Sequence, residues 1–157
     1  MRMRTGTERN VPVDILNRQR RVAGFDVATL RQRADWVVRA AGVDEMEVCV
    51  TLLSDRRIRT LNRDYRNKDK ATDVLSFAQN EGEFADLNTE ILGDVLISVE
   101  TADRQRETRT LMDEVTHLLI HGVLHLMGYD HMEDAEATLM EAEEQRIWSV
   151  IRSEETR

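Results

Sequence analysis

The sequence contains one cysteine, one proline (Pro12) and few aromatic residues among its 157 positions. A lone cysteine, Cys49, cannot form an intramolecular disulfide, so the fold is not held by disulfide bridges. No apolar run approaches the roughly 20 residues that a membrane-spanning helix needs, and the charged residues 1–8 are not followed by an apolar stretch. Repeats and low-complexity tracts are also absent. We therefore expect a cytoplasmic protein with no membrane partner.

The remaining composition is that of an ordinary globular protein, with 41% hydrophobic and 33% charged residues. A chain of this length buries roughly 70% of its unfolded surface, which is enough for one core without disulfide bonds or structural metals. We expect a single domain over residues 1–157. Cys49 lies between Val48 and Val50 in an apolar run, a setting that favours a buried core thiol over a reactive one.

The net charge of −8 is unevenly distributed. Residues 1–40 carry nine arginines against four acids, and residues 56–70 carry seven basic residues against two acids. Residues 81–114 carry ten acids against three arginines, and residues 133–157 carry eight against three. Two basic blocks could form one phosphate-attracting face on an acidic protein. Charge alone does not separate this interpretation from solvated helix surfaces of mixed sign.

Hydrophobic periodicity predicts an α+β fold with a small mixed sheet of about four strands covered by helices. One helix is expected over 27–41, ending before Gly42, and another is expected to begin at an N-cap, Ser54. The acidic segment around Gly82 is expected to be a surface loop. The remaining predicted elements are strands over 13–16, 46–53, 73–77 and 92–99, and helices over 108–127 and 134–151.

Three of the four histidines, His117, His121 and His125, recur every fourth residue in the helix predicted over 108–127. They therefore project from one face of that helix. The residues between them are almost all apolar, which indicates a helix buried on most sides. A buried imidazole needs a hydrogen-bond partner or a metal.

The spacing of His121, His125 and His131 is typical of a metal site. Histidines at i and i+4 can bind one cation from adjacent turns. Gly128 can end the helix in a left-handed conformation and turn the chain so that His131 supplies a third nitrogen. Three protein ligands leave one coordination position open, as in catalytic zinc sites. The alternative is a set of core histidines that form hydrogen bonds with one another or with carbonyl groups.

His117 lies outside this ligand pattern. We expect it to pack in the core or to support a metal ligand rather than to transfer protons.

This spacing matches the metzincin zinc-protease motif with one departure. Gly122 stands where the proteases have the glutamate that serves as general base. The departure disfavours a metzincin-like zinc peptidase, which remains an alternative. A third class, a non-catalytic module that binds RNA or the ribosome and carries a structural metal, requires a fourth protein ligand.

The segment from His121 to His131 resembles the signature of the bacterial YbeY family, endoribonucleases implicated in ribosomal RNA maturation. Two further stretches, residues 61–77 and 92–95, resemble other blocks of the family, so the resemblance spans roughly residues 46–135. Asn67 stands where the family usually has glycine, and Ala71 where it usually has proline. These departures concern the backbone of one loop.

The resemblance implies a zinc-dependent endoribonuclease that cleaves single-stranded RNA in ribosomal small-subunit maturation and quality control, with ribosomal partners. It implies that His121, His125 and His131 are the zinc ligands and that Arg66 acts near the active site. The residues themselves are compatible with this, because the basic stretch around Arg66 suits a phosphate-binding groove.

The sequence leaves several features of the chemistry open. Imidazole ligands also suit nickel and copper. Asp130, His117 and Glu114 are candidates to move protons, and Asp130 is as well placed to orient a ligand. Whether water or the 2′-hydroxyl of the RNA is the nucleophile is undetermined, as is the oligomeric state.

Overall fold

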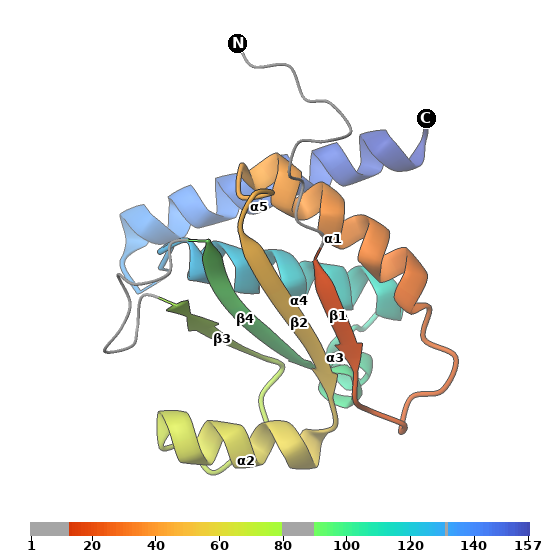
Figure 1. The fold of residues 1–157 in the computed structure, drawn as a ribbon, viewed down its shortest axis with the longest axis vertical. Helices are drawn as coiled ribbons and strands as arrows, with labels where there is room; N and C mark the ends of the chain where they lie inside the picture. Colours follow the sequence, from red (N-terminus) through yellow and green to blue (C-terminus); the bar gives the residue numbers. More distant parts are fainter. Residues whose placement is uncertain (1–12, 80–89, 131) are drawn as a thin grey trace.

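The computed structural model describes residues 13–79, 90–130 and 132–157, which form four strands and five helices (Figure 1). The predicted loop around Gly82 lies outside the described residues. In chain order the elements are β1 (Asp14–Asn17), α1 (Val27–Ala41), β2 (Glu47–Leu53), α2 (Asp55–Arg66), β3 (Val74–Ala78), β4 (Ile91–Ser98), α3 (Val99–Gln105), α4 (Leu111–Leu126) and α5 (Asp134–Glu155).

The four strands form one mixed sheet in the order β1-β2-β4-β3. Strands β1, β2 and β4 are parallel, and β3 pairs antiparallel with β4 at the edge. Helix α4 contacts both β3 and β4, so the edge strand lies beside the helix that carries the histidines (Figure 1). The predicted α+β class and four-stranded mixed sheet are confirmed.

The two faces of the sheet pack against different helices. Val50, Val95 and Ile97 are fully buried in the larger core, to which α1, α4 and α5 contribute. Alternate residues such as Leu53 and Leu75 point to the opposite face, where Ile58 of α2 completes a smaller apolar cluster. The histidine helix and the basic helix α2 therefore lie on opposite faces, both next to β3 (Figure 1).

The predicted helix ends are confirmed at two places. Gly42 caps α1 in a left-handed conformation with φ 77°. The hydroxyl oxygen of Ser54 accepts a hydrogen bond from the backbone N–H of Arg57 at 3.3 Å, so Ser54 is the N-cap of α2. Both ends depend on local chemistry, which explains why the sequence predicts them.

Helix α3 was not predicted, and the assignment of Val99 to a strand was wrong. Val99 is fully buried and begins α3, and the Ser98 hydroxyl caps this helix by accepting from Thr101 N–H at 3.2 Å. An apolar residue directly after a buried strand continues the strand pattern, so periodicity does not reveal the change of direction. Helix α4 begins three residues later than expected, at Leu111, and α5 continues beyond residue 151 to Glu155.

Cys49 is another correction, because it lies outside the core. Val48 and Val50 are buried, whereas Cys49 is partly exposed on the other face of β2. Burial raises the pKa of its thiol, which favours the unreactive protonated form. Among the helices of the described residues, none is long and apolar enough to cross a bilayer.

Candidate active site

Two of the predicted metal ligands, His121 and His125, lie on adjacent turns of α4 and face one another. Their Nε2 atoms are 3.0 Å apart, and the ring centroids are 4.5 Å apart with the planes at 77°. Both side chains are partly exposed on a helix whose other faces are buried in the core. The helical spacing therefore brings these two nitrogens together at the surface of the protein, as predicted.

Glu144 of α5 orients one of these rings and was not predicted from the sequence. Its Oε1 lies 3.1 Å from Nδ1 of His121. Burial by itself would raise the pKa of the Glu144 carboxyl. The hydrogen bond from His121 and the nearby His117 lower this pKa by more than burial raises it, so the net shift is downward. An ionised carboxylate only accepts hydrogen bonds, so Nδ1 of His121 is the donor in this contact, and the other ring nitrogen, Nε2, faces His125.

The donor set fits a transition metal ion. Two imidazole nitrogens converge, and the other nitrogen of one ring is bonded to a carboxylate, which is the usual outer support of a metal-binding histidine. Two nitrogens that share one tetrahedral zinc lie about 3.3 Å apart, given Zn–N distances near 2.05 Å. The separation of 3.0 Å in this structure is close to that value.

His131, the third predicted ligand, lies outside the described residues. Within them there is no group of three histidine, cysteine, aspartate or glutamate side chains that could hold a metal. The turn toward His131 is described: Gly128 has φ 101°, and its N–H donates to the carbonyl of His125 at 3.0 Å. The predicted left-handed glycine after the helix is therefore confirmed, and the convergence of all three imidazoles remains a prediction.

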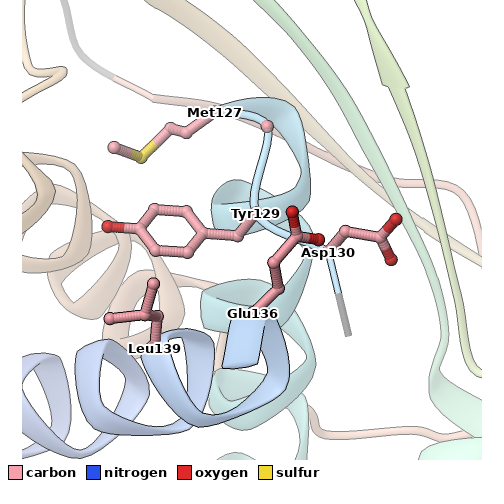
Figure 2. A pocket seen from close by; sticks show the side chains of 6 residues that line it. Met127, Tyr129, Asp130, Glu136 and Leu139 are labelled. Carbon is pink, nitrogen blue, oxygen red and sulfur yellow. The ribbon is translucent and has the colours of Figure 1, made fainter. Parts of the chain in front are cut away.

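The side chain of Tyr129 connects this turn to α5. Its ring projects toward α5 beside a hollow of about 250 Å³ that is also lined by Met127 and Leu139 (Figure 2). The hydroxyl donates to Oε2 of Glu143 at 3.4 Å. Asp130 follows, and its Oδ1 accepts from the N–H of Met132 at 3.0 Å. This bond engages one oxygen of the Asp130 carboxylate, and the role of Asp130 toward a metal ligand remains a prediction.

A cleft of about 530 Å³ lies between β3 and α4, next to the histidine pair. His121 and His125 line one wall. The other side is formed by residues of β3, by Arg66 at the end of α2 and by Lys68 just after this helix. The structure therefore brings the predicted Arg66 to the same cleft as the two histidines, although they are far apart in sequence.

Arg66 is held in place by two contacts with β3. Its Nη2 donates to the carbonyl of Ser76 at 2.8 Å, and its guanidinium carbon lies 4.5 Å from the centre of the Phe77 ring. The arrangement fixes a positive charge at the mouth of the cleft.

Two other arginines of α2 form ion pairs at the surface. Arg59 binds Asp69 at 2.9 Å, and Arg63 binds Asp64 at 3.1 Å. The hydrogen bond from Arg59 lowers the pKa of the Asp69 carboxyl. Exposed ion pairs contribute at most about 1 kcal/mol, so a phosphate can compete for these guanidinium groups.

Gly122, which occupies the position of the protease glutamate, packs directly against the sheet. A side-chain carbon at this residue would lie 2.6 Å from Cγ1 of Val95 and 3.2 Å from Oγ of Ser76. The Ser76 hydroxyl donates to the Gly122 carbonyl at 3.1 Å. There is no room for a glutamate here, so the general base of a metzincin peptidase cannot occupy this position.

The other candidate proton carriers are engaged in the fold. Glu114 is buried, and its carboxylate accepts from Arg109 at 3.1 Å and from Gln105 at 2.8 Å. His117 is half-buried one turn before His121, and this burial lowers its pKa. These surroundings favour a supporting role for both residues.

The chain is similar to known proteins over most of its length. A family model described as Endoribonuclease YbeY matches residues 14–152. An Endoribonuclease YbeY of Geobacter sulfurreducens is 43% identical over 143 residues, which cover 88% of this chain and 95% of that protein. One of Neisseria meningitidis serogroup A is 45% identical over 116 residues, 71% of this chain and 68% of that protein. The solution structure of TM1509 from Thermotoga maritima aligns with a TM-score of 0.56 at 25% identity, covering 90% of this chain and 93% of the other.

Proposed function

The chain belongs to the YbeY endoribonuclease family, and from this premise we propose that it cleaves single-stranded RNA with a metal ion held by His121, His125 and His131. The process in which it acts is ribosomal RNA maturation and quality control in the cytoplasm. The substrate is ribosomal RNA, and small-subunit components are the partners. Zinc is the proposed ion, with nickel and copper as alternatives that imidazole ligands also accept.

One observation carries the proposal: the paired Nε2 atoms of His121 and His125 open onto the cleft that Arg66 also lines. A metal site beside a fixed guanidinium is suited to a phosphodiester, whose negative charge a peptide lacks. The cleft runs beside an edge strand and is open to solvent, so an extended single strand can enter it more easily than a rigid duplex.

The residues of this chain have separable roles in that reaction. When bound, the ion supplies Lewis-acid activation at the histidine pair. Glu144 holds the His121 ring in the tautomer that directs Nε2 to the site. Arg66, fixed by Ser76 and Phe77, stabilises negative charge that develops on the phosphate. Gly122 leaves no general base at the protease position, so proton transfer relies on other groups or on solvent.

The test pairs metal analysis of the purified protein with cleavage of single-stranded and duplex RNA. We expect about one zinc per chain, cleavage of the single strand, and loss of both metal and activity in His125→Ala. Arg66→Ala should retain the metal and lower kcat/KM about 100-fold or more, as removal of a charge-stabilising donor does. The matched control is Arg57→Ala, because Arg57 lies on α2 away from the cleft.

Other outcomes would favour the alternatives. Cleavage that persists without stoichiometric metal and in His125→Ala would remove the metal from the proposal. Peptide hydrolysis by the metal-loaded protein would favour the peptidase, which the packing of Gly122 disfavours. Tight RNA binding without turnover, together with a fourth protein ligand, would identify a binding module.

A further inference from the structure

Tyr65 is a large side chain that the fold leaves uncovered. Ile58, Leu61, Asn62 and Tyr65 recur at helical spacing and form the sheet-facing side of α2. Ile58 and Asn62 are buried, whereas Tyr65 in the last turn is 66% exposed. The end of α2 lies near β3 (Figure 1), and within the described residues β3 is an edge strand of the sheet.

The ring of Tyr65 is adjacent to the groups that form the mouth of the cleft. It meets Phe77 edge to face, with ring centroids 5.6 Å apart and planes at 70°. The same Phe77 ring carries the guanidinium of Arg66 at 4.5 Å. Pairwise contacts therefore lead from Arg66, which lines the cleft with the histidines, through Phe77 to the exposed ring of Tyr65.

We propose that Tyr65 is the stacking platform for the base of a nucleotide next to the phosphate that Arg66 contacts. Proteins hold unpaired strands by stacking bases on exposed aromatic side chains and by pairing phosphates with arginine. Because its contact with Phe77 is edge to face, the arrangement is compatible with an exposed ring face. The inference rests on the proposed endoribonuclease function and adds a positioning residue to it.

A tyrosine that stacks on a base makes RNA binding depend on the presence of that base, whereas a tyrosine that only supports the fold does not. Every base has a π-face, so stacking tolerates all four bases but requires that a base be present. Tyr65 should therefore distinguish a normal nucleotide from an abasic one at a single position relative to the cleavage site. The loss of that base and the loss of the Tyr65 ring should not add, because either change removes the same contact.

The experiment measures cleavage and binding of single-stranded RNA oligonucleotides in which one abasic site is moved along the strand. Binding is measured in the His125→Ala background, in which cleavage is not expected. Tyr65→Ala should weaken binding of intact RNA about tenfold. Tyr65→Phe should retain binding, and Tyr65→Leu, which keeps apolar bulk without a π-face, should behave like Tyr65→Ala. Leu16→Ala, which removes an exposed apolar side chain from the far edge strand β1, is the matched control.

The outcomes distinguish a failure of the stacking role of Tyr65 from a failure of the proposed endoribonuclease function. Wild-type protein that neither binds nor cleaves RNA would overturn the proposed function and this proposal with it. Normal cleavage by wild type together with unchanged binding in Tyr65→Ala would overturn the stacking role alone. Additive losses at every abasic position would overturn it as well, since they would place the effect of Tyr65 elsewhere. An unchanged Tm in Tyr65→Ala excludes a folding defect.

Discussion

Gly122 illustrates how one residue constrains both packing and chemistry. Its position against Val95 and Ser76 leaves no space for a β-carbon. Valine has a stiff χ1 torsion, so Val95 cannot rotate away easily. We expect Gly122→Ala to lower the free energy of unfolding by about 1–3 kcal/mol, the usual cost of overpacking a core. Urea denaturation at neutral pH measures this change.

The control for Gly122 is a double-mutant cycle with Val95. Val95→Ala alone removes buried methyl groups and is destabilising. In the double variant the new methyl group should occupy part of the vacated space. The two losses should therefore sum to more than the loss of the double variant. Strict additivity would show that the close approach of Gly122 to Val95 does not limit the packing.

Glu144 offers a second prediction at the residue scale. Glu144→Gln keeps the size of the side chain but replaces the carboxylate that accepts from Nδ1 of His121. We expect zinc affinity to fall 10- to 100-fold, the usual effect of removing such a support. A chelator competition assay measures the affinity. The matched control is Glu143→Gln, since among the described residues Glu143 bonds Tyr129 and Arg146 but no histidine. Equal losses in both variants would contradict the assigned role.

The end of α2 shows how an element positions a site residue. Asn67 caps this helix in a left-handed conformation, with φ 58° and its N–H bonded to the Arg63 carbonyl at 3.2 Å. Asparagine tolerates this region better than other non-glycine residues, so it can replace the glycine usual in the family. The departure at Asn67 is therefore compatible with the same turn, and Arg66 directly before it still reaches the cleft.

A substitution at this cap tests the argument. Asn67→Gly should be neutral or slightly stabilising, whereas Asn67→Val should lose about 1–2 kcal/mol because a β-branched residue is strained at positive φ. Thermal unfolding measures both variants. If Asn67→Val were as stable as Asn67→Gly, the left-handed cap would not contribute to the stability of α2.

At the scale of elements, the sequence predicted those strands and helix ends that depend on a local pattern alone. Alternation identified the strands, and Ser54, Gly42 and Gly128 marked helix ends through capping chemistry. Helix α3 was missed because Val99 is buried by tertiary contacts and reads as the continuation of β4. Cys49 was misplaced because an apolar run does not reveal which face of the sheet is covered.

The site was predictable only in part for a similar reason. The histidine pair follows from the period of a helix, so spacing within one element was sufficient. The contact of Glu144 with His121 joins two helices, and no local pattern in α5 indicates it. The Arg66 position depended on the resemblance to a family, because the end of α2 reaches the cleft only once β3 has paired with β4.

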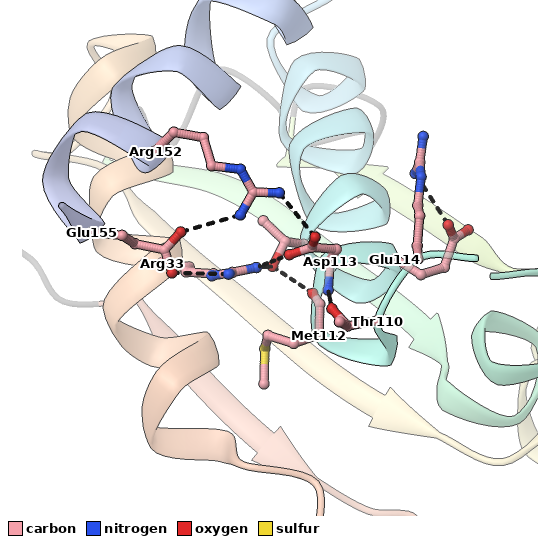
Figure 3. Close-up of polar contacts among 9 residues, drawn as sticks. Arg33, Thr110, Met112, Asp113, Glu114, Arg152 and Glu155 are labelled. Carbon is pink, nitrogen blue, oxygen red and sulfur yellow. Dashed lines mark hydrogen bonds and ion pairs between the residues drawn. The ribbon is translucent and has the colours of Figure 1, made fainter. Parts of the chain in front are cut away.

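At the scale of the whole molecule, a charged network joins three helices (Figure 3). Arg33 of α1 is buried and binds Asp113 of α4 and Glu155 of α5, each at 2.9 Å. Arg152 of α5 binds Asp113 at 2.9 Å as well. Asp113 therefore accepts from two arginines at once. Removing one partner of a buried ion pair lowers the free energy of unfolding, because the remaining charge stays uncompensated in the low-dielectric interior.

This network makes the stability of the fold dependent on pH. Burial by itself would raise the pKa of the Asp113 carboxyl. The hydrogen bonds and charges of Arg152 and Arg33 lower this pKa by more than burial raises it, so in the folded state it lies below the ordinary value of an aspartate. A group whose pKa is depressed by folding stabilises the protein above its unfolded pKa and loses that contribution as pH falls through the folded value. The loss attributable to Asp113 therefore lies on the acid side of about pH 4.

We expect Asp113→Asn to lower the free energy of unfolding by about 1–3 kcal/mol at neutral pH. The difference between wild type and variant should shrink as pH falls below about 4, because protonation removes the same charge from wild type. Urea denaturation from pH 7 to pH 3 measures both proteins, and Asp103→Asn, in an exposed ion pair with Arg106, is the control. A difference that stays constant across this range would show that Asp113 acts through packing and not through its charge, and the three helices would then be held together without an electrostatic contribution from this residue.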